Sequence, residues 1–343
     1  MTHYTPILRW KRGERVALQN VATARRTGVT PLLFLAADQF KGKEPNSSSP
    51  ARTAAECFVT EVRNAWGIGP FYLDASGVAP TPAHPHPLVD IALAARAAGL
   101  QLIPATRQSA SGSYQADVQA VAAIDLRGVA LRVDMQGLTS AATWTGSWAH
   151  ALGDTDLIVD FADQVGVVAA MGGSVVHAFS TLHAAGAWRM VSVAGSNIPA
   201  NLTGYVAGVH TLPRAEYQLW QQLDAAGLHY PISFGDYCTV PLAAPPAGIA
   251  WGFPISVRYT LDQEFLICRG VGTTGFSGVD MDLQLTQHAQ TIVGFPARAR
   301  LAGCWADDRI DAIAAASSGP GNLESWVQIS VNRHIELTRD RLP

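Results

Sequence analysis

The most regular pattern in the chain is a short apolar strand that follows a glycine, and it is clearest in the segment GVALRVDM beginning at Gly128. Side chains alternate between the two faces of a strand, so one face of this segment is purely apolar and the other carries Arg132 and Asp134. A helical run precedes the glycine, a residue that readily ends a helix in the left-handed conformation. The pattern predicts a helix, a strand and a polar strand end in succession.

The same pattern recurs, which allows the strands to be counted. Seven glycines each precede an apolar strand: Gly28, Gly67, Gly99, Gly128, Gly153, Gly186 and Gly227. The segment YTPILRW at 4–10 adds one strand before them, and the second and the last of the eight strands are predicted at 30–37 and 231–236. Helices are predicted between the strands at 14–26, 51–66, 87–98, 114–126, 141–152, 163–185 and 214–226.

Eight strands alternating with helices predict an α/β fold, a (β/α)8 TIM-like barrel in which the first strand pairs with the eighth. An open, doubly wound sheet with two flanking segments is the alternative. Similar strand lengths and the absence of GxGxxG after the first strand favour the barrel. Three strand-to-helix loops are long and polar, at 39–50, 76–86 and 196–213, and barrels carry their sites at that end.

Beyond Tyr237 the pattern changes. In order, we expect a connector rich in Pro, Ala and Gly at 239–254, hairpin strands at 255–260 and 264–269, helices at 281–293 and 307–316, and a closing strand at 326–337. The chain is therefore predicted to have two parts, a barrel at 1–238 and an α+β extension at 239–343. The extension is expected to pack on the barrel, because apolar runs such as 265–267 need burial.

Composition limits the classes of function. The formal net charge of −3 argues against general nucleic-acid binding. The four cysteines lie far apart with no CxxC pair, as expected of free thiols in a reducing cytoplasm. No run approaches the roughly 20 apolar residues of a membrane span, and no secretory leader begins the chain. These observations predict a cytoplasmic protein without a membrane partner.

Polar residues at the strand ends form the candidate site. Parallel strands of a barrel end at one rim, so these side chains are expected to converge on one pocket. The candidate catalytic carboxylates are Asp74, Asp134 and Asp236. The candidate ligand-binding residues of the barrel are Arg9, Lys11, Tyr72, Arg132, Ser196 and Tyr237. Two interpretations stay open: a structural ion-pair network that plugs the barrel, or a pocket whose cations hold an anionic group while carboxylates act as bases.

The extension adds three candidates for ligand binding. Arg258 and Arg269 are either solvent-facing hairpin residues or a clamp for phosphate or carboxylate over the mouth. His334 is either a structural histidine or a general acid–base group. Neither HExxH nor DxDxDG is present, so the sequence identifies no metal site and leaves any cofactor unknown.

Eight short segments spread over nearly the whole chain have counterparts elsewhere. They are YTPILRWKRGE (4–14), TPLLFL (30–35), YLD (72–74), SNIPANL (196–202), FGDY (234–237), VRYT (257–260), LICRG (266–270) and NRHI (332–335). Together they resemble the beta protein family of phage and bacterial genomes. The chain departs from the family at two positions: relatives commonly have an acidic residue where Phe34 stands and a second histidine where Arg333 stands. The resemblance implies an association with phages or mobile elements.

Two hypotheses of function follow. The first is a phage- or mobile-element-associated barrel protein that binds an anionic, phosphate- or nucleotide-like small molecule at the barrel mouth, as a hydrolase or lyase. The alternative is a non-catalytic protein in a phage or phage-defence setting that captures a ligand or a partner protein.

Overall fold

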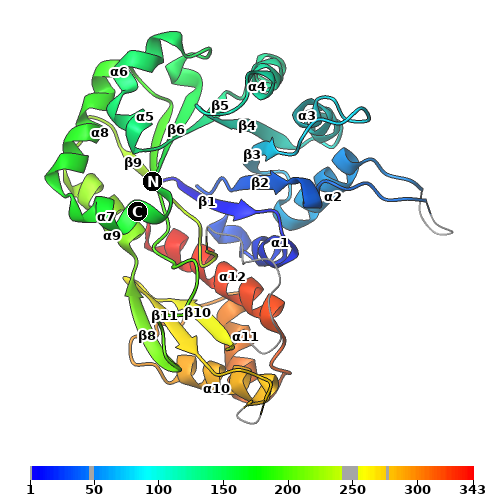
Figure 1. Cartoon of the computed structure of the whole chain (residues 1–343), viewed down its shortest axis with the longest axis vertical. Coiled ribbons are helices and arrows are strands. Elements are labelled where there is room, and N and C mark those ends of the chain that lie inside the picture. Colours follow the sequence, from blue (N-terminus) through cyan, green and yellow to red (C-terminus); the bar gives the residue numbers. More distant parts are fainter. Residues whose placement is uncertain (1, 46–49, 242–253, 276–277) are drawn as a thin grey trace.

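The structure, a computed structural model, describes residues 2–45, 50–241, 254–275 and 278–343 (Figure 1). Eight parallel strands close into a barrel in which each strand pairs with its neighbours in chain order. They are β1 (Tyr4–Arg9), β2 (Leu32–Ala36), β3 (Pro70–Gly77), β4 (Gln101–Arg107), β5 (Val129–Val133), β6 (Thr155–Asp160), β7 (Met190–Ala194) and β9 (Ile232–Asp236). β1 closes the barrel by pairing with β9, with Tyr4 opposite Phe234. The α/β barrel and the predicted pairing of the first and eighth strands are confirmed.

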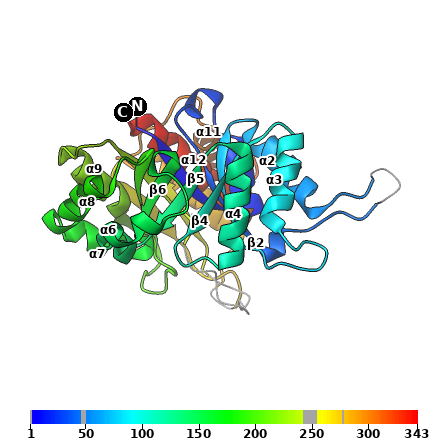
Figure 2. The ribbon, with the colours of Figure 1, turned by 90° about the horizontal axis from the view of Figure 1, so that it is seen from above.

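Helices cover the outside of the barrel, as the view from above shows (Figure 2). They are α1 (Arg12–Gln19), α2 (Ala54–Trp66), α3 (Pro87–Ala97), α4 (Gly112–Asp125), α5 (Met135–Thr139), α6 (Ala141–Trp144), α7 (Val165–Ala170), α8 (Gly173–Ala185) and α9 (Ala215–Ala225). Short 3-10 helices occupy Thr23–Arg25, Ala37–Gln39, Thr145–Ser147, Leu152–Asp154 and Ala162–Gln164. Three predicted helices differ from the structure. The run 141–152 is α-helical only over Ala141–Trp144, and a 3-10 helix follows at Thr145–Ser147. The run 14–26 is α-helical only to Gln19, and the run 163–185 is divided into α7 and α8 at Gly172, whose φ of +51° interrupts the helix.

Two sets of apolar side chains hold the barrel together. The outward faces of the strands pack against the helices in one continuous core. A smaller core fills the inside of the barrel with Ile7, Leu32, Tyr72, Ile103, Ala105, Ala130, Ile158 and Ala194. Strand side chains alternate, so the residue two positions further along each strand also faces inward, at the carboxyl end. For six of the strands these residues are Arg9, Phe34, Asp74, Arg107, Arg132 and Asp160.

The extension is built around a three-stranded antiparallel sheet. The predicted hairpin is confirmed as β10 (Ser256–Thr260) and β11 (Glu264–Arg269), and the two predicted helices are α10 (Met281–Val293) and α11 (Trp305–Ala314). The third strand, β8 (Gly208–Pro213), comes from the loop between β7 and α9 and pairs with β11. We predicted this segment as part of a loop, because GVHTLP is short and half exposed and lacks the apolar alternation of the barrel strands. The boundary between barrel and extension at residue 238 stays a prediction.

The last element, α12 (Leu323–Arg341), is a helix, so the closing strand predicted at 326–337 is wrong. The segment WVQISVNRHIEL contains β-branched residues in alternation, and it is buried on nearly all sides, which hides the period of an amphipathic helix. Val331 and Ile335 of α12 belong to the core of the barrel, whereas Trp326 and Ile329 belong to the core of the extension. α12 packs against α1, and therefore supplies the barrel with the helix that follows its eighth strand (Figure 1).

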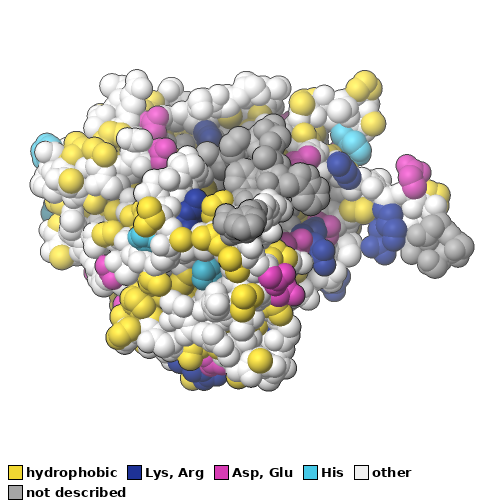
Figure 3. Space-filling model, turned by 60° about the horizontal axis from the view of Figure 1, so that its bottom comes forward, with side chains coloured by type: hydrophobic (Ala, Val, Ile, Leu, Met, Phe, Trp, Pro, Cys, Tyr) yellow, Lys and Arg dark blue, Asp and Glu magenta, His cyan; other side chains and the backbone are white. Residues whose placement is uncertain are grey.

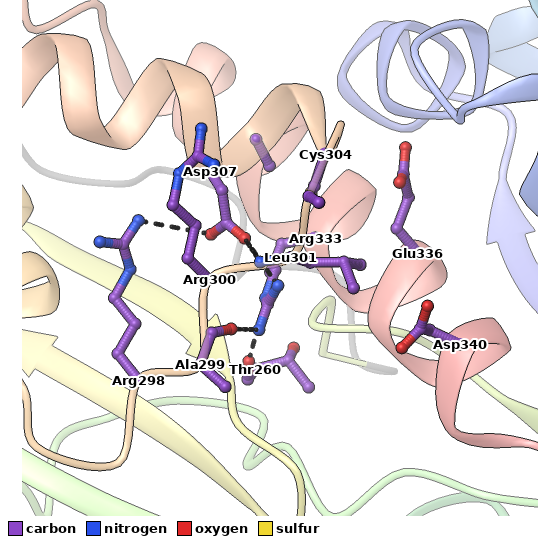
Figure 4. Close-up of polar contacts among 12 residues, drawn as sticks. Thr260, Arg298, Ala299, Arg300, Leu301, Cys304, Asp307, Arg333, Glu336 and Asp340 are labelled. Atoms are coloured by element: carbon purple, nitrogen blue, oxygen red, sulfur yellow. Dashed lines mark hydrogen bonds and ion pairs between the residues drawn. The ribbon is translucent and has the colours of Figure 1, made fainter.

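A buried ion pair fixes α12 against α11. Arg333 Nη1 lies 2.7 Å from Asp307 Oδ2, and neither side chain is more than 1% exposed (Figure 4). The same Asp307 accepts hydrogen bonds from the Tyr259 hydroxyl and the Leu301 amide, and Arg333 also donates to the carbonyl of Ala299. Arg333, one of the two positions singled out in the sequence, thus lies in a structural pair, away from the barrel mouth.

We expect Arg333→Met to lower the free energy of unfolding by up to about 3–5 kcal/mol, because the buried Asp307 carboxylate loses its nearer cation and keeps only Arg298, whose Nη2 lies 3.6 Å from Oδ1. Chemical denaturation measures the loss. Arg12→Met is the matched control, since Arg12 pairs with Glu324 between α1 and α12 in an exposed position, where a pair contributes about 1 kcal/mol at most. Equal losses in the two variants would contradict a structural role for the buried pair.

Truncation tests the part that α12 plays in the barrel. A chain ending at residue 240 lacks Val331 and Ile335 and exposes the outer faces of β1 and β9, so we expect aggregation or loss of cooperative unfolding. Soluble yield, circular dichroism and limited proteolysis of the full chain are the measurements. A monomeric 1–240 fragment that unfolds in one sharp transition would show that the barrel is independent of α12.

Candidate functional site

The carboxyl ends of the barrel strands surround two adjoining hollows. The larger has a volume of about 530 Å³ and the smaller about 310 Å³. Both are lined by Arg107, Arg132, Asp160 and Ala162, so they form one mouth with two lobes. This is the end at which barrels place their sites, and the volume is in the range of pockets for small molecules.

An ion-pair network forms the floor of the mouth. Arg132 donates to Asp74 Oδ2 at 3.3 Å, to Asp160 Oδ2 at 2.5 Å and to the Tyr237 hydroxyl oxygen at 2.5 Å. The Tyr237 hydroxyl in turn donates to Asp160 Oδ2 at 2.5 Å. β3, β5, β6 and the end of β9 are therefore joined across the inside of the barrel by one guanidinium.

Burial and pairing set the charges of this floor. Burial alone would lower the pKa of Arg132, but Tyr237, Asp160 and Asp74 outweigh it and hold that pKa above its ordinary value. Burial alone would raise the pKa of Asp160, but Arg132 and the Tyr237 hydrogen bond outweigh it and hold that pKa below the ordinary value. The network is thus a charged one at neutral pH, and both terminal nitrogens of Arg132 donate within it.

Arg107 is the cation that faces the mouth. Its side chain is 43% exposed, and its Nε donates to Asp74 Oδ2 at 3.3 Å. Its guanidinium stacks over the ring of Phe34 at 5.8 Å. Among the residues that the structure describes, its two terminal nitrogens have no hydrogen-bond partner. We missed Arg107, although it shares the inward face of β4 and stands in register with Arg132.

Glu14 is a second residue that we missed, and it lines the smaller lobe. It is 3% exposed, and its Oε1 accepts a hydrogen bond from the amide of Arg9 at 3.0 Å. Burial raises its pKa to about 7, against the opposing effects of Arg9 and Lys11. A carboxyl group with this pKa can exchange a proton at neutral pH. The only sequence signal for Glu14 was its place at the end of the segment YTPILRWKRGE.

Three predicted residues lie at or near the rim. Arg9 lines the smaller lobe and donates to the carbonyl of Pro241 at 2.8 Å. Asp134 lines the larger lobe, and its Oδ1 caps α5 by accepting from the amide of Gly137 at 2.8 Å. Lys11 is exposed at the start of α1 and lines neither lobe.

Other predicted residues do not reach the mouth. The Tyr72 hydroxyl donates to Asp156 at the amino end of β6, where Arg189 closes the opposite side of the barrel. Ser196 lines a separate depression with Asn197. The expected convergence of strand-end residues therefore holds for some of the set and fails for these two.

The two arginines of the extension also lie outside the mouth. Arg258 lines a small crevice with Ser256 and Ser330, where burial lowers its pKa to about 10. Arg269 donates to the carbonyl of Tyr205 and to the hydroxyl of Ser256, within the sheet of the extension.

Asp236 and His334 lie behind the barrel sheet. Asp236 shares its strand face with Ile232 and Phe234, which are buried against the helices, so its side chain also points outward. His334 reaches it from α12 at 2.6 Å. We placed Asp236 at the mouth from its position at a strand end and overlooked the face that it shares with Phe234.

Charged side chains are scattered over the face of the molecule that Figure 3 shows. On the face seen in Figure 3, Lys and Arg side chains and Asp and Glu side chains occur in small separate groups. In the described part of the chain, no single helix is both long and apolar enough to cross a membrane; one bent pair, Ala162–Ala170 with Gly173–Ala185, passes that test by length and composition only.

Comparison with known proteins places the chain in a family. A search of curated proteins found no match. The family model described as Beta protein matches residues 4–338, which is nearly the whole chain and includes all eight segments that carry the resemblance. The chain is a member of the Beta protein family.

Proposed function

We propose that the barrel mouth binds a small anionic ligand, of the phosphate or nucleotide type, through Arg107. The half-exposed guanidinium of Arg107 carries the proposal. Its two terminal nitrogens are the fork that binds carboxylate or phosphate in a bidentate way, and no described residue occupies them. Both lobes of the mouth border this guanidinium.

The other cations of the mouth explain why Arg107 is the binding residue. Arg132 is surrounded by two carboxylates and a phenol, so it has little remaining attraction for an anion. Arg107 shares Asp74 with Arg132 and rests on Phe34, an aromatic ring where relatives commonly have an acidic residue. A ring supports the guanidinium without neutralising it, which leaves positive charge for a ligand.

Polar groups around the larger lobe suit the rest of such a ligand. Gln108, Ser109, Gln136 and Ser140 line it, and each offers donors or acceptors for a sugar or a base. Asp134, on the same lobe, has one carboxylate oxygen outside its helix-capping bond and suits a ligand hydroxyl.

Hydrolase or lyase chemistry is the more demanding form of the proposal. Glu14 and Asp134 are the carboxylates that face the mouth without an arginine partner in the described chain. Glu14, with a pKa of about 7, is the better general acid–base group. Because Asp74 and Asp160 are held by Arg132, the alternative of ligand capture without turnover, in a phage or phage-defence setting, is retained beside it.

The location of the protein belongs to the same proposal. All four cysteines are free, and three of them are buried, which suits a reducing cytoplasm. Association with phages or mobile elements comes from the family resemblance.

Replacing Arg107 tests the binding proposal. Inorganic phosphate, nucleoside mono- and diphosphates and sugar phosphates are screened for an increase in the melting temperature. A ligand at 100 times its dissociation constant stabilises the folded chain by about 2.7 kcal/mol, and we expect Arg107→Met to abolish this gain. Arg63→Met, on exposed α2, is the control and should keep it. The proposal is refuted if ligand raises the melting temperature of Arg107→Met as much as that of the wild type, or if no ligand stabilises the wild type.

The pKa of Glu14 makes a second prediction. The folded chain keeps this carboxyl protonated up to about pH 7, whereas the unfolded chain loses the proton near pH 4.5, the ordinary pKa of a glutamate. The stability that the protonated group supplies is therefore fully present below pH 4.5 and is lost as the pH rises through 7. Glu14→Gln cannot titrate, so we expect its stability relative to the wild type to rise between pH 4.5 and 7. Denaturant unfolding at several pH values measures the difference, and a difference constant over this range would contradict the raised pKa.

A further inference from the structure

A second cluster of reactive side chains lies outside the mouth, on the outer side of the barrel sheet. It stands where β9 ends, beside β1 and α12, and contains Tyr4, Asp236, Cys238 and His334. None of the four is more than 2% exposed. Binding at the mouth uses none of them. Burying so many polar groups together costs free energy unless they hydrogen-bond to one another or bind a ligand.

The donor atoms of the cluster converge. His334 Nε2 lies 2.6 Å from Asp236 Oδ2, and the Tyr4 hydroxyl donates to Asp236 Oδ1 at 2.9 Å. Cys238 Sγ is 3.9 Å from the same hydroxyl. One ligand atom each from Asp236, Cys238 and His334 lies within 4.8 Å of the other two.

The local backbone is arranged to bring the carboxylate and the thiol together. The amide of Cys238 donates to Asp236 Oδ1 at 3.0 Å, which turns the chain back on itself after β9. Cys238 has a φ of +52°, a left-handed conformation that a residue with a side chain adopts at a cost. The strained residue is therefore the one whose Sγ lies beside Asp236 and Tyr4.

The imidazole of His334 is also held in place. Its Nδ1 lies 3.0 Å from the Thr260 hydroxyl of β10, so its other nitrogen, Nε2, is directed at Asp236. Burial lowers the pKa of His334, against the opposing effect of Asp236, so the ring is neutral at physiological pH. Metal-binding histidines are oriented in this way by a hydrogen bond to the nitrogen that does not bind the metal.

We propose that Asp236, Cys238 and His334 bind a zinc ion that joins the barrel to α12. Carboxylate, thiolate and imidazole are the three donor types that zinc prefers, and the Tyr4 hydroxyl is the fourth polar group at the site. With bonds of about 2.0 Å, neighbouring oxygen and nitrogen ligands of a tetrahedral zinc are about 3.3 Å apart. The Asp236–His334 contact therefore has to widen by about 0.7 Å, which small side-chain rotations supply.

Zinc binding also balances the charge of the cluster. The Cys238 thiol gives up its proton to solvent as sulfur binds, and the resulting thiolate and the Asp236 carboxylate together neutralise Zn²⁺. Without the ion, burial raises the pKa of the Cys238 thiol and keeps it protonated. All the groups are enclosed, so the site is a closed structural one in which metal is taken up as the chain folds.

Metal content and cobalt spectroscopy test the proposal on the full chain. The protein is unfolded, freed of metal, refolded with zinc or cobalt chloride, dialysed and measured by mass spectrometry. We expect about one ion per chain and, with cobalt, a sulfur-to-cobalt charge-transfer band. Cys238→Ser should lose this band, and His334→Gln should bind metal at least about tenfold more weakly.

Two control variants exclude binding elsewhere. Cys57→Ser removes a half-buried thiol outside the cluster, and His183→Gln removes one ring of the His183–His229 contact, whose centroids are 5.1 Å apart. Both should bind metal as the wild type does. If the cluster variants do not fold, X-ray absorption on the wild type tests the proposal instead. We expect one sulfur in the first coordination sphere of the metal. Failure of the refolded wild type to bind either ion, or metal that survives in both cluster variants, would overturn the proposal.

Discussion

The burial of α12 between two cores is the constraint on which the rest of the structure depends. Val331 and Ile335 complete the core of the barrel, and Trp326 and Ile329 complete that of the extension. Polar residues on the same helix are buried as well, so each must find a partner: Arg333 finds Asp307, His334 finds Asp236, and Glu336 finds Arg25. These pairings specify how α12 is rotated, because a helix turned by one residue would leave charges unpaired.

Inside the barrel, the structure of the mouth also depends on the pairing of buried charges. One buried guanidinium, that of Arg132, pairs with carboxylates from β3 and β6, and this leaves the terminal nitrogens of Arg107 free to face the mouth. Of the two interpretations that the sequence left open, the structural network is present at this barrel end, and the ligand pocket is what we propose for the hollow above it. The lower layer is closed by ion pairs, and the layer above it is hollow and bordered by a cation.

The barrel could be predicted because its signal is local and repeated. Seven of the eight strands follow a glycine, and the order of the strands in the barrel follows their order in the chain. The full set of mouth residues could not be predicted as well, because it depends on where each strand ends and which face its end presents. Arg107 was left out of the predicted site, and Asp236 was assigned to the mouth although its side chain points outward. α12 and β8 were missed because the signals for them are long-range. α12 is buried all round, and β8 is a strand only because β11 lies beside it.

The path of β8 has a mechanical consequence. Its strand leaves the barrel after β7, joins the extension sheet and returns to the barrel at α9, while α12 enters both cores at the other end of the extension. A domain that is joined by a single linker can rotate about that linker. Here the extension is joined to the barrel by both ends of β8 and by α12, which packs in both cores. Large swinging motions of the kind that open and close two-domain clefts are therefore resisted, and any rearrangement on binding the ligand that we propose would be confined to the loops around the mouth.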